Sequence, residues 1–137
     1  MSTDAPIADR IEIAELFTRL AHLIDEGRWD DAGTIYADDV VMRSPRAGEL
    51  RGIDEVIGYL HRAEVDGEHT QHMTTDLLVD VNGDEAAASA NSLVHFYRDG
   101  RAPHLTSGLR LTCTAVRTPA GWRFREARIA PVWTRKD

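Results

Sequence analysis

Three residues of this sequence are suited to acid–base chemistry: Asp25, His72 and His95. An imidazole exchanges a proton near neutral pH, and a carboxylate beside it fixes which ring nitrogen carries the hydrogen. Asp25 comes one helical turn after Ala21 and continues the apolar face of a predicted helix, so we expect it to be partly desolvated. The carboxylate and the two imidazoles are the minimal set for moving a proton to and from a bound small molecule.

The spacing of the two histidines predicts that they are neighbours. Asn82-Gly83 is a strong hairpin signal between two predicted strands. A regular hairpin at that turn pairs Thr70 with His95. Because alternate residues of a strand share a face, His72 then points the same way as His95.

Other roles are open to the same residues. An aspartate before Gly27 at a helix end is often solvated, and a strand histidine is more often hydrogen-bonded than catalytic. A metal site is disfavoured, because the sequence has no HxH, HExxH or CxxC pair and His69 has the opposite strand parity to His72. It also has no GxGxxG, P-loop or GxSxG motif. Cys113 lies in an apolar alternation typical of a structural thiol. We therefore predict no metal and no cofactor.

Composition narrows the class of protein. The chain has 137 residues, of which 42% are hydrophobic and 28% charged, which predicts one domain over residues 1–137. A net charge of −7 argues against a nucleic-acid partner, since phosphate contacts need a basic surface. The sequence shows no secretory signal and no apolar run long enough to cross a bilayer. With a single cysteine, we expect a cytoplasmic protein without a membrane partner.

Hydrophobic periodicity predicts helices first and strands afterwards. We expect a helix within residues 1–26, a short helix from Trp29 that ends at Asp38-Asp39, a strand over 40–42, a loop over 46–52 and a third helix over 53–63. Strands then follow up to residue 81 and over 86–97, 105–115 and 122–132. This order indicates the α+β class. A curved, mainly antiparallel sheet wrapped around three helices would form a cone-shaped barrel, and its open end would be a pocket.

Two stretches of the sequence resemble a known family. Leu20 to Asp39, LAHLIDEGRWDDAGTIYADD, resembles the opening of SnoaL-like proteins of the nuclear transport factor 2-like superfamily, and Ala120 to Phe124 resembles their ending. The resemblance implies the same cone-shaped α+β barrel. This superfamily holds dehydratases, isomerases, polyketide cyclases and non-catalytic proteins, so the fold leaves the activity open.

Within the family, the chain is most similar to the scytalone dehydratases. Their catalytic aspartate precedes a Trp-Asp pair, as Asp25 precedes Trp29 and Asp30. Their first catalytic histidine ends a Thr-Gln-His run, which matches His72, and the second lies on the next strand, which matches His95. The resemblance implies that one histidine is first base and then acid in a syn elimination of water, while the aspartate orients the other.

The resemblance and the strand parity together suggest five substrate-binding residues. Ser44 stands where the scytalone dehydratases have a water-holding tyrosine, and Tyr97 has the parity to supply a phenol from another wall. Asp76 has the parity of His72, and Asn91 has that of His95, although both are equally plausible as surface residues. Trp29 is a candidate apolar wall or a plain core residue.

The sequence thus predicts a cofactor-independent acid–base enzyme. Its favoured reaction is dehydration of a hydrophobic, carbonyl-containing small molecule, polyketide-like or aromatic, held in the cone. A polyketide cyclase, a ketosteroid-isomerase-like isomerase and a non-catalytic ligand-binding protein are the alternatives. By analogy with the family we expect a homodimer through the outer sheet face. The enzyme hypothesis requires that Asp25, His72 and His95 converge.

Overall fold

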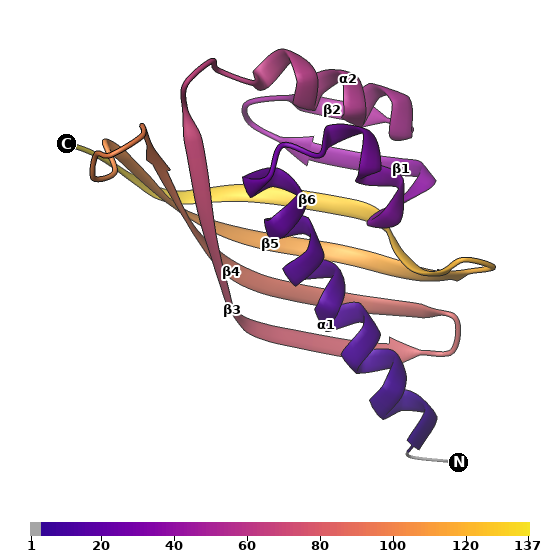
Figure 1. Cartoon of the computed structure of the whole chain (residues 1–137). Helices are drawn as coiled ribbons and strands as arrows, with labels where there is room; N and C mark the ends of the chain where they lie inside the picture. Colours follow the sequence, from indigo (N-terminus) through magenta and orange to yellow (C-terminus); the bar gives the residue numbers. More distant parts are fainter. Residues whose placement is uncertain (1–3) are drawn as a thin grey trace.

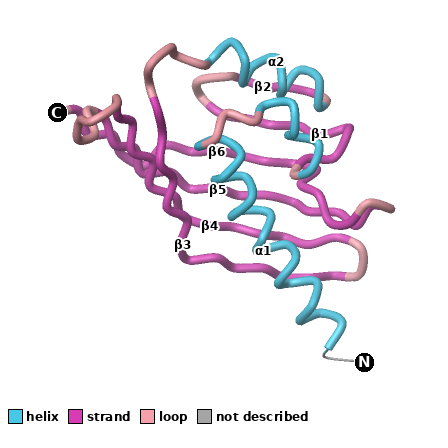
Figure 2. Tube along the Cα trace, in the orientation of Figure 1, coloured by secondary structure: helices cyan, strands magenta, loops and turns pink. Residues whose placement is uncertain are grey.

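The computed structural model of the protein describes residues 4–137. Its described elements form one curved six-stranded sheet with helices on its concave side (Figures 1 and 2). In chain order they are α1 (Asp4–Asp25), the 3-10 helix η1 (Trp29–Thr34), β1 (Tyr36–Ser44), β2 (Gly48–Arg51), α2 (Ile53–Ala63), β3 (His69–Asn82), β4 (Glu85–Tyr97), β5 (Leu105–Thr118) and β6 (Gly121–Lys136).

The sheet has the strand order β2-β1-β6-β5-β4-β3. Strands β3 to β6 are antiparallel neighbours, and β1 joins β6 in parallel. Its two edge strands, β2 and β3, do not pair with each other within residues 4–137, so the cone is open. The prediction of an α+β fold with a curved, mainly antiparallel sheet around the helices is confirmed.

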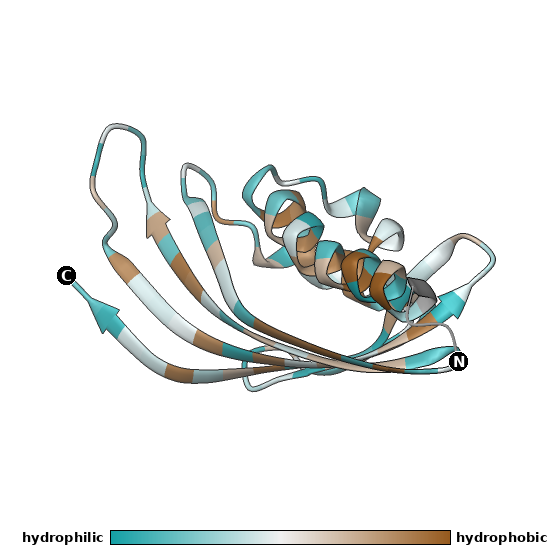
Figure 3. Cartoon of the chain, turned by 90° about the horizontal axis from the view of Figure 1, so that it is seen from below, coloured by the Kyte–Doolittle hydropathy of each residue, from teal (hydrophilic) through white to brown (hydrophobic). Residues whose placement is uncertain are grey.

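Helix α1 crosses the concave face and lies nearest to β3 and β6. The concave side of β4 under the helix carries the small residues Ala86, Ala88 and Ala90, all buried. From the helix, Phe17 enters the core and its ring lies 4.9 Å from that of Phe124 on β6. Figure 3 shows that the helices cover only part of the concave face, and that β4, β5 and β6 extend beyond them. The uncovered part is the wide end of the cone.

Two boundaries differ from those predicted. The second helix ends at Thr34, and Tyr36 to Asp39 belong to β1, because Ile35 already accepts a backbone hydrogen bond from Phe124 of β6. The predicted loop over 46–52 contains β2, which pairs with the end of β1. This strand has one buried apolar residue, Leu50, and therefore lacks the alternation that predicts a strand.

The hairpin between β3 and β4 has a different register from the predicted one. Its turn lies at Gly83-Asp84 rather than at Asn82-Gly83, since Asn82 pairs with Glu85. In addition, the pairing shifts between Thr75 and Leu78, where β3 contains a β-bulge. The bulge changes which residues of β3 face the helices.

None of the helices in residues 4–137 is both long and apolar enough to cross a membrane.

Candidate active site

The last residue of α1, Asp25, is hydrogen-bonded to β3 through both carboxylate oxygens. Its Oδ1 lies 2.5 Å from Nδ1 of His72 and accepts a hydrogen bond of 2.9 Å from the hydroxyl of Thr70. Its Oδ2 accepts the backbone N–H of His72 at 2.9 Å. A carboxylate in the final turn of a helix faces the negative end of the helix dipole, so these donors offset an unfavourable position.

The contact with Asp25 determines the tautomer of His72. An ionised carboxylate can only accept hydrogen bonds, so Nδ1 of the imidazole must carry the hydrogen. In the neutral ring, Nε2 then holds a free lone pair. This nitrogen can take a proton from a bound molecule, and the carboxylate stabilises the imidazolium that forms.

The environment of Asp25 keeps it ionised near neutral pH. Burial raises the pKa of its carboxyl, but the side-chain and backbone hydrogen bonds from His72, the charge of that ring and the Thr70 hydroxyl together lower it more. The net pKa lies below its usual value of 3.8. Asp25 is therefore a fixed negative charge beside the imidazole.

The pair is partly buried and still reachable. The side chain of Asp25 is 23% exposed and that of His72 is 13% exposed. The register places Val94 of β4 directly opposite His72, followed by Ser107 of β5, so these residues share the concave face with the imidazole. This half of the sheet is the part that extends past the helices in Figure 3.

His95 lies on the other face of the sheet, and the prediction that the two imidazoles are neighbours is wrong. His95 pairs with Gln71, while His72 pairs with Val94, and directly opposed residues share a face. Nδ1 of His95 is instead 3.0 Å from the hydroxyl of Thr106, its partner on β5. The bulge in β3 is the cause, because one extra residue turns over every side chain before it.

Asp76 and Asn91, both predicted to bind substrate, contact each other at the bulge. Asn91 donates a hydrogen bond of 3.0 Å from its side-chain amide to Oδ2 of Asp76. Thr75 donates a second to the same oxygen at 3.1 Å. Asn91 has the parity of His95 on β4, so this pair lies on the convex face.

The other predicted substrate-binding residues have hydrogen-bond or packing partners outside the Asp25–His72 pair. Tyr97 has the parity of His95 and packs against His69 with 5.4 Å between ring centroids. The hydroxyl of Ser44 accepts the backbone N–H of Ala47 in the turn after β1. Trp29 packs against the core and donates from Nε1 to Glu64 at 3.3 Å.

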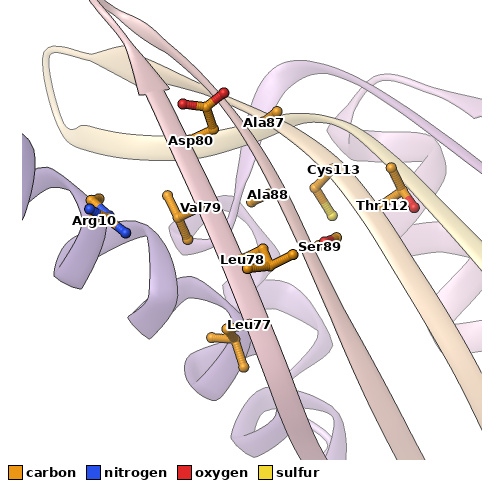
Figure 4. Close-up of a pocket in the computed structure, with 10 residues that line it drawn as sticks. All are labelled: Arg10, Leu77, Leu78, Val79, Asp80, Ala87, Ala88, Ser89, Thr112 and Cys113. Carbon is orange, nitrogen blue, oxygen red and sulfur yellow. The ribbon is translucent and has the colours of Figure 1, made fainter.

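A pocket of about 430 Å³ lies far along α1 from Asp25 (Figure 4). Arg10 borders it from the helix, and Leu77 to Asp80 of β3, with short segments of β4 and β5, form its sides. Burial raises the pKa of Cys113, one of its lining residues, to about 12, so that thiol stays protonated at neutral pH. The pocket contains none of the three predicted catalytic residues.

Across residues 4–137, no three His, Cys, Asp or Glu side chains come together in a group suited to a metal ion. The carboxylate of Asp25 already accepts three hydrogen bonds, from a hydroxyl, an imidazole and a backbone N–H. These are hydrogen-bond partners, and they leave Asp25 little capacity to bind a cation.

Sequence reasoning did not assign a role to Thr70, which donates to Asp25. Strand parity offers a signal for it. Residues two apart on a strand share a face, so any carboxylate that reaches His72 also lies near the side chain of Thr70.

The fold is that of the nuclear transport factor 2-like superfamily, an open cone of curved sheet around an N-terminal helix. Residues 5–128 match the SnoaL-like domain family, and the chain therefore belongs to that family. The resemblance noted from the sequence is confirmed. An uncharacterised protein of Mycobacterium tuberculosis is 29% identical over 128 residues, which span 90% of this chain and 86% of the relative.

Solved structures support the fold. The hexachlorocyclohexane dehydrochlorinase LinA-type3 of Novosphingobium barchaimii matches with a TM-score of 0.86 at 15% identity, covering 99% of this chain and 94% of that one. A provisionally named scytalone dehydratase of Novosphingobium aromaticivorans matches with a TM-score of 0.86 at 15% identity, covering 99% and 92%. At these identities the likeness establishes the fold, and this fold family includes lyases that act on small molecules.

Proposed function

We propose that the chain is a cofactor-independent lyase that uses His72 to eliminate a leaving group from a hydrophobic small molecule. The observation that carries the proposal is the contact between Asp25 and Nδ1 of His72, which leaves Nε2 free as a base. The two similar solved structures are named as a dehydrochlorinase and a scytalone dehydratase, and both names describe elimination reactions. The favoured substrate is a β-hydroxy carbonyl compound, polyketide-like or aromatic.

The elimination can be written with one imidazole. Nε2 of His72 takes a proton from the carbon next to the carbonyl group, and the C–H electrons form the new C=C bond. The bond from the neighbouring carbon to its hydroxyl group breaks, and the hydroxyl takes the proton back from Nε2 and leaves as water. Asp25 stays ionised throughout and stabilises the transient imidazolium. The ring ends neutral, so no second histidine and no cofactor is needed.

His95 has no place in this scheme, because it lies across the sheet from His72. The proposal therefore replaces the predicted Asp/His/His site with an Asp25–His72 pair assisted by Thr70. Isomerisation and cyclisation share the same first step, removal of the proton next to the carbonyl group, and differ in where the electrons of that C–H bond go. They remain the alternative activities, and products distinguish them.

The test is a screen of β-hydroxy carbonyl compounds and chlorinated cyclohexanes, followed by ultraviolet absorbance of enone products, mass spectrometry and chloride release. The test variant is His72→Asn, and the matched control is His61→Asn. His61 is also paired with an aspartate, Asp30, at 2.8 Å, but both side chains are well exposed. We expect turnover by the wild type and by His61→Asn, and none above background by His72→Asn. Turnover that survives His72→Asn would refute the proposal, and saturable binding without turnover across the panel would favour a ligand-binding protein.

We also propose that two copies associate through the convex face of the sheet. Met73, Leu93, Gly108 and Trp133 lie opposite one another in one row across β3, β4, β5 and β6. Of these, Met73 and Trp133 are each 48% exposed and Leu93 is 38% exposed, an apolar stripe that a partner of the same kind would cover. Analytical ultracentrifugation should show a dimer that Leu93→Glu dissociates, and a monomeric wild type would contradict this.

We also propose that the protein is cytoplasmic, because its single cysteine, Cys113, would stay reduced in that compartment.

A further inference from the structure

We propose that Asp76 is a positioning residue whose β-bulge turns His72 onto the concave face of the sheet, where it meets Asp25. The inference builds on the proposed function, because it explains how the acid–base pair is assembled. It concerns a residue that touches neither Asp25 nor His72, and it assigns a purpose to the irregular stretch of β3.

The pairing register shows what the bulge changes. On the side toward the turn, Leu78 pairs with Ser89 and Asn82 pairs with Glu85. An uninterrupted ladder with this register would place His72 directly opposite His95. In the structure β3 contains one extra residue between Thr75 and Leu78, and His72 pairs with Val94 instead.

A shift of one residue exchanges the two faces of the strand. Beyond the bulge, Leu77 and Val79 pack against the core, and Figure 4 shows both on the side of β3 toward α1. Before the bulge, Thr70 and His72 face α1, and both bond to Asp25. In a regular ladder of the same sequence, without the bulge, Gln71 and its alternate neighbours would face the helix. Both side-chain donors to Asp25 would then point to the convex side.

Two features of Asp76 hold the bulge. Its φ of 55° is in the left-handed region, which aspartate and asparagine tolerate better than most other residues. Its carboxylate accepts hydrogen bonds from Thr75 on its own strand and from Asn91 on β4. Asn91 pairs with Thr75, where regular pairing resumes. The side chain therefore fastens the irregular backbone to the neighbouring strand.

The experiment compares Asp76→Ala, Asp76→Asn and Asp80→Ala in the full chain. Alanine loses both the tolerance for a positive φ and the two hydrogen bonds, whereas asparagine keeps the tolerance and an acceptor oxygen. Asp80 is a matched control, because it is an exposed aspartate of the same strand in regular pairing with Ala87. Circular dichroism shows whether each variant is folded.

The readout is the proton nuclear magnetic resonance signal of the hydrogen between Nδ1 of His72 and Asp25, which should lie far downfield because the bond is short. We expect the wild type, Asp76→Asn and Asp80→Ala to keep the signal, and Asp76→Ala to lose it along with at least about tenfold in kcat. An Asp76→Ala protein that keeps the signal would overturn the inference. If Asp76→Ala does not fold, Asn91→Ala provides the test, because it removes the hydrogen bond from β4 to Asp76. Loss or broadening of the signal in Asn91→Ala would support the inference. An unchanged signal would overturn it.

This design separates the inference from the proposed function. A wild type that shows the signal and turns over nothing in the substrate panel would remove the proposed lyase activity, while the loss of the signal in Asp76→Ala would still establish the positioning role. A wild type that turns over substrate, with signal and rate untouched by Asp76→Ala, would remove the positioning role alone.

Discussion

Helix α1 carries an aspartate near each end that accepts three hydrogen bonds from the sheet, and the two aspartates have different partners. Asp9 accepts two bonds from the guanidinium of Arg117, at 2.9 and 3.1 Å, and one from Nε1 of Trp122 at 3.1 Å. Asp25 accepts its bonds from Thr70 and from the ring and backbone of His72. Both carboxyls have a lowered pKa.

The partners of the two aspartates differ in whether they can exchange a proton. Arg117 also bonds to Asp84 and lies over the ring of Trp122, and the pKa of its guanidinium is raised further, so it never releases a proton. The Asp9 cluster can only hold α1 against β5 and β6. An imidazole exchanges its proton near neutral pH, and His72 keeps one nitrogen free. The contact at one end of the helix is therefore structural, and the contact at the other end is the one to which the proposed function assigns proton transfer.

The largest expected effect is that of His72→Asn. The asparagine amide can still donate to Asp25, so the fold and its thermal midpoint should stay close to those of the wild type, but the base is gone. We expect kcat for the elimination to fall by about 10²–10⁴-fold. The matched variant His61→Asn should retain the wild-type rate, and an equal loss in both variants would contradict a special role for His72.

Asp25→Asn should have the next largest effect, because it changes the tautomer while keeping the shape. An amide nitrogen at this position donates to Nδ1 of His72, which moves the ring hydrogen to Nε2 and removes the base. We expect kcat to fall by roughly 10²-fold or more with little change in KM. Asp30→Asn, the counterpart in the exposed His61 pair, serves as the control. Full activity of Asp25→Asn would mean that the carboxylate does not orient the ring.

At the other end of α1, Trp122→Phe should change stability and leave catalysis alone. Trp122 is fully buried, and phenylalanine keeps much of its volume while losing the N–H that bonds to Asp9. We expect the free energy of unfolding to fall by about 1–2 kcal/mol, measured by urea denaturation. The rate per folded molecule should not change, and a large loss of kcat would contradict the separation of the two ends.

The pH dependence of stability should distinguish Asp9 further. The hydrogen bonds from Arg117 and then from Trp122 hold the pKa of Asp9 below its usual 3.8 in the folded protein. Because the folded pKa is the lower one, this stabilisation is present above pH 3.8 and is lost as the pH falls through the folded value. The difference in thermal midpoint between the wild type and Asp9→Asn should be largest near neutral pH and should shrink below pH 3.8. A difference that grows in acid would contradict this assignment.

Ser92→Ala should have the smallest effect, and of the opposite sign. Ser92 is on the concave side of β4, one pleat from the residue opposite His72, and its hydroxyl is buried without a hydrogen-bond partner among the described residues. Removing a buried, unpaired hydroxyl should raise the free energy of unfolding by about 1 kcal/mol. Chemical denaturation measures this, and a destabilised variant would show that the hydroxyl has a partner in the folded protein.

The sequence predicts the elements far better than it predicts the faces of the strands. Apolar spacing located α1 and α2, and the alternation of Leu109, Leu111 and Cys113 located β5, because buried faces demand those patterns. The resemblance predicts that Asp25 orients one of the two imidazoles, and the structure shows that this imidazole belongs to His72. The position of His95 does not follow from the sequence, since it depends on the one extra residue at Asp76. A bulge leaves the composition of a strand unchanged, and an aspartate within a strand gives no clear sign that it adopts a positive φ.

The central claim is that Asp25 holds His72 with Nε2 free to accept a proton. A long-range proton–nitrogen correlation spectrum of protein labelled with nitrogen-15 in histidine reads the tautomer of each ring directly. Near neutral pH, the neutral form of His72 should carry its hydrogen on Nδ1 in the wild type and on Nε2 in Asp25→Asn. A wild-type His72 with its hydrogen on Nε2 would contradict the account, because the nitrogen that faces the ligand would then have no lone pair to offer.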